Sequence, residues 1–450
     1  WEREGGDKGH KGVHHGDGVW TKAIKDFRNT RVKKELPAWI TGQRHFLDAV
    51  DGRPPEAVHD ALRAALEALH QQADPTEPDR LAAGYRELQQ GEGYRALRAA
   101  FDTWCACWFW PADALDRAPS PSSFEQPAAD TAALVAELAR RHGFFHWELE
   151  YPDVFREEGG GFDVVLGNRP WETLQPNSKE YFSNLDPLYR SYGKQEALRH
   201  QLSIFGNERQ ERDWISYIAN YKALANWTRN AGQPFGDDDA NGDRFNLGSG
   251  STTLHAAWRH RRSGWMSFAD PEHPFRVQGE GKPYTYKMFV EQSRALLRPG
   301  GRLGLVVPSG IYTDKGTTAL RRLLLDASHW RWLFGFENRL GIFAIDSRFK
   351  FCPIIVEKRG ATALLSTAFM RHELADWEDA ERHAVPYARA QVERFSPKTL
   401  AILEIHGLRD IAVLEKIYAN AVLLGDDGPE GWGIKYAQGD FNMTSDSHLF

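Results

Sequence analysis

The stretch GFDVVLGNRPWE, residues 161–172, is the most informative part of this 450-residue chain. Its residues 162–166 are apolar except for Asp163 and include the β-branched Val164 and Val165, which is typical of a short strand buried in a parallel sheet. The residues that follow, Gly167 to Pro170, favour a tight turn. We therefore predict a functional turn at the carboxyl end of a buried strand.

Strands and helices alternate on the carboxyl side of this stretch. Apolar runs predict strands at residues 302–308, 330–336 and 349–357, and helical periodicity predicts helices at 284–298 and 317–328. This alternation is typical of an α/β sheet. The segment between the first strand and the first of these helices, residues 172–280, reads as irregular.

The amino-terminal third has a different, helical character. Periodicity predicts helices at residues 57–70, 81–110 and 131–142, with a Pro/Ser-rich linker at 118–128. The end of the chain, residues 388–421, also reads as largely helical. No internal repeat is present.

Composition narrows the class of protein. The net charge is −6, from 56 basic and 62 acidic residues, so contact with nucleic acid requires a local basic face. Three cysteines cannot build a disulfide framework, which favours a reducing, cytoplasmic location. No apolar run reaches the roughly 18 residues of a membrane span. Because the chain begins at Trp1 without a signal peptide, we expect a piece of a longer protein.

The turn Asn168-Arg169-Pro170-Trp171 resembles the catalytic motif Asn-Pro-Pro-(Tyr/Phe/Trp) of DNA methyltransferases that modify adenine N6. Three further segments resemble large restriction–modification and phage-defence enzymes of the type IIG kind: FHWELEYPDVF (145–155), LLRPGGRLGLVVPSGIYTDKGT (296–317) and FENRLGIFAIDSRFKFC (336–352). A fourth, FNMTSDSH (441–448), lies where such proteins continue toward target recognition. The resemblance covers residues 144–182, 284–358 and 431–450.

The resemblance implies a Rossmann-like class I methyltransferase sheet, of which this chain would hold the catalytic half. A helical amino-terminal region is expected at 1–143. The catalytic half is expected at 144–360, with a long insertion at 172–283. A helical connector toward a target-recognition region is expected at 361–450.

The motif also implies a mechanism. Adenine N6 is a poor nucleophile, and two acceptors that bind its two hydrogens would localise its lone pair. The resemblance gives these roles to the Asn168 amide oxygen and the Arg169 main-chain carbonyl, with Pro170 shaping the turn and Trp171 stacking on the base. The partner would be double-stranded DNA with a flipped adenine. Phe343 is the candidate for a second stacking aromatic, with core packing an equal alternative, whereas Phe349 and Phe351 fit a buried strand.

One departure from the family pattern leaves alternatives open. Arg169 occupies the position of the family's first proline, so the carbonyl is kept but the rigidity of two prolines is lost. Activity is either retained with a looser loop or weakened. The alternatives are a catalytically inactive DNA-binding subunit, a bifunctional restriction enzyme with its nuclease outside this piece, or a plain strand-to-turn junction.

The implied cofactor is S-adenosyl-L-methionine, yet its Gly-rich loop cannot be recognised before residue 162. The glycines at 159–161 lie too close to the catalytic strand, and NLGSG (246–250) follows no apolar strand. An acidic loop at His15 to Asp17 is a weak candidate for contact with the adenine of the cofactor. We therefore expect weak or absent binding of the methyl donor by residues 1–450 alone, which isothermal titration can test.

Charged residues, cysteines and histidines elsewhere in the chain are candidates for DNA or metal binding. The densest basic cluster, WRHRR (258–262), provides Arg259, Arg261 and Arg262 as candidates for phosphate contact, and Arg348 and Lys350 are two more. No metal site is predicted. The acidic turn from Asp237 has Gly248 where a calcium loop needs Glu, Cys105 and Cys107 lack a second pair, and His10 and His14 lie in a Gly-rich tail. Further subunits of a restriction or defence system are expected partners, and a membrane is not.

Overall fold

The computed structural model describes residues 55–425, except 73–75, 121–122, 124–126, 156–159, 231–274, 276 and 280–281, and a few residues at 26–35 and 428–434. The chain divides into two compact units. The first comprises residues 1–165 and 170–301, and the second comprises residues 166–169 and 302–450.

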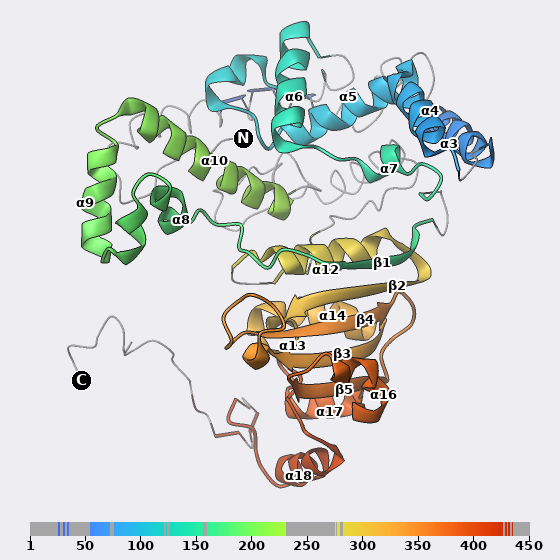
Figure 1. Ribbon diagram of the computed structural model, residues 1–450, viewed down its shortest axis with the longest axis vertical. Coiled ribbons are helices and arrows are strands. Elements are labelled where there is room, and N and C mark those ends of the chain that lie inside the picture. The colour runs from blue at the N-terminus through green and yellow to red at the C-terminus, as the bar shows by residue number, and fades with distance from the viewer. Residues whose placement is uncertain are drawn as a thin grey trace. The chain divides into compact units, whose positions relative to one another are not determined.

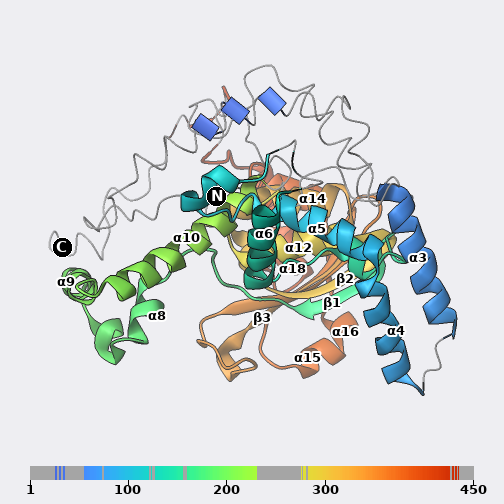
Figure 2. The same cartoon turned by 90° about the horizontal axis from the view of Figure 1, so that it is seen from above.

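Helices form the amino-terminal part of the first unit. They are α3 (Pro55–Gln72), α4 (Pro78–Gln90), α5 (Glu92–Ala106), α6 (Ala129–His142) and the short α7 (Trp147–Glu150). The helices predicted at 57–70 and 131–142 are confirmed. The helical stretch predicted at 81–110 is confirmed as far as Ala106 and consists of two helices, because Gly91, with an extended ψ of 147°, separates α4 from α5. Helices α3 and α4 lie side by side (Figure 2).

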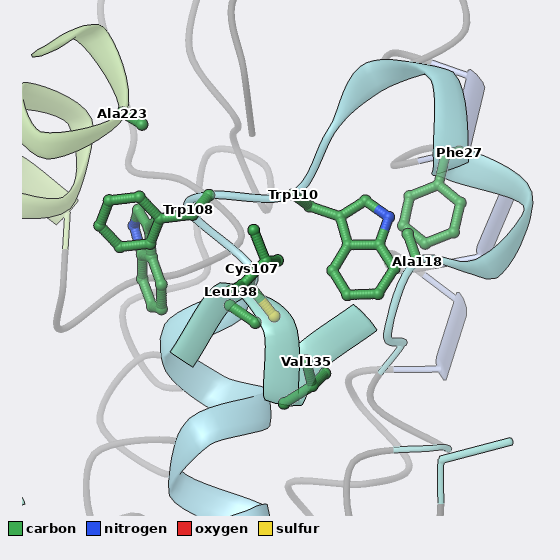
Figure 3. Packing of buried hydrophobic residues seen from close by; sticks show 10 residues of the cluster. Phe27, Cys107, Trp108, Trp110, Ala118, Val135, Leu138 and Ala223 are labelled. Carbon is green, nitrogen blue, oxygen red and sulfur yellow. The ribbon is translucent and has the colours of Figure 1, made fainter. Parts of the chain in front are cut away.

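The dense aromatic run after α5 builds the core of this unit. Trp108 and Trp110 are buried together with Cys107, and they pack against Val135 and Leu138 of α6 (Figure 3). The Trp110 indole donates to the main-chain carbonyl of Ala114, 2.8 Å away, so its one polar atom is satisfied. Cys107 is buried, as predicted for a core residue, whereas Cys105 is half-buried.

The segment predicted as irregular after the motif is helical where it is described. It contains α8 (Ser178–Ser183), α9 (Lys194–Ile204) and α10 (Glu208–Asn230). Phe182, Tyr189, Trp214 and Ile218 form a separate aromatic core there. The prediction failed because polar residues dominate these helices, and their few apolar side chains are mostly aromatic. The acidic stretch at 236–243 lies outside the described residues.

A six-stranded mixed sheet follows, with strand order β1-β2-β4-β3-β5-β6 (Figure 1). The strands are β1 (Phe162–Asn168), β2 (Leu297–Pro308), β3 (His329–Glu337), β4 (Lys350–Glu357), β5 (Leu364–Arg371) and β6 (Val385–Ala388). Strand β4 is antiparallel to both β2 and β3, so β2 and β3 run in the same direction. Strand β3 is parallel to β5, and β6 is antiparallel to β5. The predicted α/β class is confirmed.

Glycines reveal the direction of β1 beside β2. A Cβ at Gly301 would lie 2.7 Å from the Phe162 carbonyl, and one at Gly304 would lie 2.9 Å from the Leu166 side chain. The residue numbers rise together, so β1 and β2 are parallel. The carboxyl ends of β1, β2 and β3 therefore lie at one edge of the sheet, the edge at which α/β sheets bind ligands.

Strand β1 departs from the prediction of a buried strand. Val164 is 61% exposed and Leu166 is 80% exposed. The reason is its position, since β1 is the terminal strand of the order and has a sheet neighbour on only one side among the described residues. Gly161 directly precedes the strand and has φ 134°, and a Cβ there would lie 2.5 Å from the main-chain nitrogen of Arg298. This position therefore requires glycine.

The other strands carry the core of the second unit, where Leu305, Trp330, Leu333 and Ile354 are at most 2% exposed. The helices at 284–298 and 317–328 are confirmed as α12 (Thr285–Leu296), in the first unit, and α14 (Thr318–Asp326). Short α13 (Gly310–Thr313) follows β2. The predicted helical connector at 361–450 is partly wrong, because β5 and β6 precede α17 (Arg389–Phe395) and α18 (Leu408–Ala419). No helix in the described ranges is long and apolar enough to cross a membrane.

Candidate active site at the carboxyl edge of the sheet

Asn168 is the last residue of β1, and its side chain is exposed. Among the described residues, its amide makes no hydrogen bond. An asparagine amide carries one acceptor oxygen and two donor hydrogens. The β1 strand thus ends in a hydrogen-bonding group that the described fold does not use.

Arg169 and Pro170 are also exposed. A Cβ at Gly167 would lie 3.5 Å from the Nε of Arg169, so the guanidinium group lies back over the glycine. The strand has room for this because Gly167 carries no side chain. The guanidinium group of Arg169 is therefore directed along β1.

Thr285, the first residue of α12, anchors the chain on both sides of Trp171. Its hydroxyl is 2.7 Å from the Pro170 carbonyl oxygen and 3.0 Å from that of Glu172, and its main-chain N–H donates to Glu172 over 2.8 Å. The half-buried Trp171 is thus carried by a segment whose backbone is fixed. Thr285 is a residue that no sequence signal identifies, because nothing in the sequence indicates that the two sides of the long insertion meet.

Phe343 lies in the loop between β3 and β4 and is half-buried, in T-shaped contact with Phe351 at a centroid distance of 4.7 Å. Phe351 is 2% exposed, as expected for a core strand. Phe349 is predicted to lie in the same buried strand, and this prediction is wrong. Strand β4 begins one residue later, at Lys350, and Phe349 is 51% exposed.

The described basic candidates for DNA contact are ion-paired. Arg348 is 2.6 Å from Asp346, and the pKa of that carboxyl is lowered to about 2 by its hydrogen bonds to Arg348. Lys350 lies 2.7 Å from Glu404 and 3.1 Å from Glu337. Burial lowers the pKa of Lys350, but the two carboxylates outweigh burial and raise it overall. Arg348 is exposed and remains accessible to a ligand, whereas the charge of Lys350 is neutralised by the carboxylates of Glu337 and Glu404.

Several candidates lie outside the described residues: Arg259, Arg261, Arg262, His10, His14, His15, Asp17, Asp237 and Gly248. Within the described ranges, no group of three His, Cys, Asp or Glu side chains is arranged to hold a metal ion. Burial raises the pKa of the Cys107 thiol to about 12, so this cysteine is a poor ligand at neutral pH.

The segment FHWELE, quoted above for its resemblance, has a structural role in the first unit. The imidazole of His146 is 2.7 Å from the Asp102 carboxylate of α5, and both residues are buried. The Glu150 carboxylate accepts hydrogen bonds from the hydroxyls of Tyr94, at 2.7 Å, and Tyr85. Burial and the bond to Glu150 raise the pKa of Tyr94 to about 12. These contacts attach α7, and the chain that enters β1, to α4 and α5.

A site for S-adenosyl-L-methionine requires a close approach of backbone to the methionine part, which a Gly-rich turn after a strand provides. In residues 55–155, as far as they are described, the chain is helical and no strand precedes β1. The described residues therefore do not fit this cofactor.

Neither a protein family model nor a curated protein matches the sequence. Among solved structures, the M protein of the type I restriction enzyme EcoKI is similar, with 15% identity and a TM-score of 0.23 over 30% of this chain and 41% of that chain. A chain from a structure of a type I restriction–modification system has 16% identity and a TM-score of 0.24, over 34% and 38%. A modification subunit of a putative type I restriction enzyme from Vibrio vulnificus has 11% identity and a TM-score of 0.25, over 66% and 67%. The chain thus spans about two fifths of the length of the EcoKI M protein and of the chain from the type I restriction–modification system.

Proposed function

We propose that this chain is the catalytic half of a DNA methyltransferase that modifies adenine N6 in a restriction–modification or phage-defence system. One observation carries the proposal. An exposed asparagine amide without a described partner ends a parallel strand, and an Arg-Pro-Trp turn with an anchored backbone follows it. Ligand sites of α/β sheets lie at this edge.

The chemistry follows from the acceptors. The Asn168 amide oxygen and the Arg169 carbonyl oxygen each accept one hydrogen of the adenine amino group, which localises the nitrogen lone pair for attack on a methyl group. Fixed acceptors act without reorganisation during the reaction, which is the main source of electrostatic catalysis. Trp171 stacks on the extruded base, and the hydrogen bonds of Thr285 to its neighbours keep the turn in place.

The methyl donor, S-adenosyl-L-methionine, supplies the group that is transferred. We propose that it binds on the open side of β1, where further elements would complete a Rossmann-like class I sheet. The exposed apolar side chains of Val164 and Leu166 support this, because an apolar β-branched strand is normally covered on both faces.

Contacts to the DNA backbone are a further part of the proposal. Arg259, Arg261 and Arg262 are retained as phosphate-binding candidates from the sequence. Arg348 is retained because its side chain is 88% exposed beside the Phe343 loop. Charge removal at such positions should weaken binding evenly across DNA sequences and flatten its salt dependence.

Methylation by the full-length gene product tests the function. Genomic DNA from cells that express it is read by adenine-methylation-sensitive sequencing, with Asn168→Ala as the comparison. Modified adenines in one sequence context that vanish in the variant would support the proposal. A wild-type protein that leaves all adenines unmodified would refute it.

A second candidate function is a DNA-binding subunit that has lost catalysis. Two observations favour it: Arg169 in place of proline, and the lack of a cofactor cradle in the described residues. It predicts sequence-specific DNA binding without methylation, and activity gained on Arg169→Pro. Electrophoretic mobility shifts beside the methylation assay separate the two functions.

A further inference from the structure

Asn338 follows β3 directly and is completely buried, with an exposed fraction of 0%. Its side chain is bonded to the backbone of the loop that follows. The amide nitrogen donates to the carbonyls of Phe343 at 3.0 Å and Ile345 at 3.1 Å, while the amide oxygen accepts from the Phe343 N–H at 2.9 Å. Both main-chain polar groups of Phe343 therefore bind one side chain.

The Phe343 ring is held as firmly as its backbone. It is in T-shaped contact with the ring of Phe351, and the Phe351 ring stacks on Phe336 with an interplanar angle of 10°. Phe336 and Phe351 are buried at 1% and 2%, so the ring is attached to the core of the second unit. Gly341, with φ 69°, reverses the chain between Asn338 and Phe343.

Large apolar side chains are exposed around this fixed loop. Leu340 is 65% exposed, Ile345 is 41% exposed and Phe349 is 51% exposed. The exposed side chains of Arg339 and Arg348 flank them. Apolar and aromatic side chains beside arginines form the kind of surface on which unstacked nucleic-acid bases bind.

The loop shares an edge of the sheet with Asn168. Strands β2 and β4 lie between β1 and β3, so the two strand ends are about 14 Å apart at the usual strand spacing. That span suits a nucleotide lying across the edge, with its base between the two strand ends.

We propose that Asn338 is a positioning residue for the methyltransferase reaction. Its amide fixes residues 341–346 so that the half-buried Phe343 and the apolar side chains around it receive the base that leaves the duplex. The inference rests on the proposed function, because it assigns a role in base extrusion to a residue that does not touch the base.

The test compares three variants of the full-length gene product: Asn338→Ala, Asn338→Asp and the control Thr362→Val. Thr362 is also buried and also bonds to loop backbone, but at the amino end of β3, where it accepts from Trp330 N–H and donates to the Ser328 carbonyl, both at 2.8 Å. In the extrusion assay the DNA carries 2-aminopurine in place of the target adenine found by sequencing, and its fluorescence reports extrusion. Methylation kinetics are measured on the same DNA with adenine at that position, because 2-aminopurine has no N6 amino group to accept the methyl group. Thermal unfolding is measured alongside kcat and KM.

Asn338→Ala should lower kcat and the 2-aminopurine signal about tenfold while KM for DNA changes by less than about threefold, because extrusion and orientation are lost and phosphate contacts are kept. Thr362→Val should lower Tm without lowering kcat. Asn338→Asp should recover activity as pH falls, because a protonated carboxyl regains one donor.

Wild-type extrusion in Asn338→Ala, or equal losses of kcat in Asn338→Ala and Thr362→Val, would overturn the role of Asn338. If Asn338→Ala does not fold, the pH series of Asn338→Asp decides, and a flat series rejects the proposal. A wild-type protein without methylation would instead refute the proposed function.

Discussion

Two asparagines end two parallel strands of the same sheet and meet opposite environments. Asn168, at the end of β1, is exposed, and its amide bonds to no other described residue. Asn338, after β3, is fully buried and uses both amide atoms on its own loop. The same side chain thus has two roles, because a satisfied buried amide fixes a loop while an exposed one remains available to a ligand.

The largest expected effect comes from removing the available amide. Asn168→Ala should lower kcat by about a thousandfold, the size expected for a lost transition-state hydrogen-bonding group. Its Tm should not change, since the side chain supports nothing in the described fold. Methylation kinetics and thermal unfolding measure the two effects, with the exposed Asn184→Ala as the control. A large drop in Tm would remove the contrast with Asn338.

Loosening the segment around Trp171 should have a smaller effect. Thr285→Val keeps the shape but loses the hydroxyl bonds to Pro170 and Glu172. We expect kcat to be about tenfold lower, because a reacting group is misplaced. The free energy of unfolding should fall by about 1 kcal/mol, because the hydroxyl hydrogen bonds are lost. Thr318→Val, which loses a comparable bond to the Lys315 carbonyl, is the matched control. Equal kinetics in both variants would show that Thr285 does not position the turn.

Stiffening the turn at Arg169 should raise activity. Arg169→Pro makes the turn match the methyltransferase motif that it resembles and keeps the carbonyl acceptor, so we expect a gain of about threefold from a turn that loses less entropy on ordering. Arg169→Ala, which removes the cation without adding rigidity, separates the two causes. A gain in the alanine variant alone would identify the guanidinium, and not flexibility, as the limiting feature.

The smallest effect concerns the base of the Phe343 loop. Glu337 lies beside Asn338, and the hydrogen bond from His372, followed by that from Lys350, lowers the pKa of its carboxyl. A lowered pKa stabilises the fold above the unfolded-state pKa, about 4.3 for Glu, and this stabilisation is lost as pH falls through the folded-state pKa. Tm should therefore fall in acid less steeply in Glu337→Gln than in wild type. Parallel Tm–pH curves would contradict this.

Sequence reasoning located the strand and turn of the motif because both depend on local signals. It predicted residues 162–166 to be buried, since an apolar strand normally has two neighbours, and position in the strand order cannot be read from the strand itself. It missed β5 and β6, whose pairing is set by distant partners such as Leu365 and Tyr387.

The residues that support the site, Asn338 and Thr285, could not be predicted from local sequence patterns either. Asn338 reads as an ordinary turn residue, and Thr285 as the first residue of a helix. Their roles arise from bonds to backbone that the fold brings to them. A motif predicts which groups meet the substrate, but the residues that hold those groups emerge from tertiary contacts.

The placement of β4 has a consequence for how the protein is made. Strand β4 is synthesised after β3 but pairs between β2 and β3, so both earlier strands leave the ribosome with an open edge. Nascent chains that stop before Lys350 would leave one edge of β2 and both edges of β3 without these partners, because β5 also follows, and open edges favour aggregation. Chaperone demand during translation should therefore drop once Glu357 has emerged.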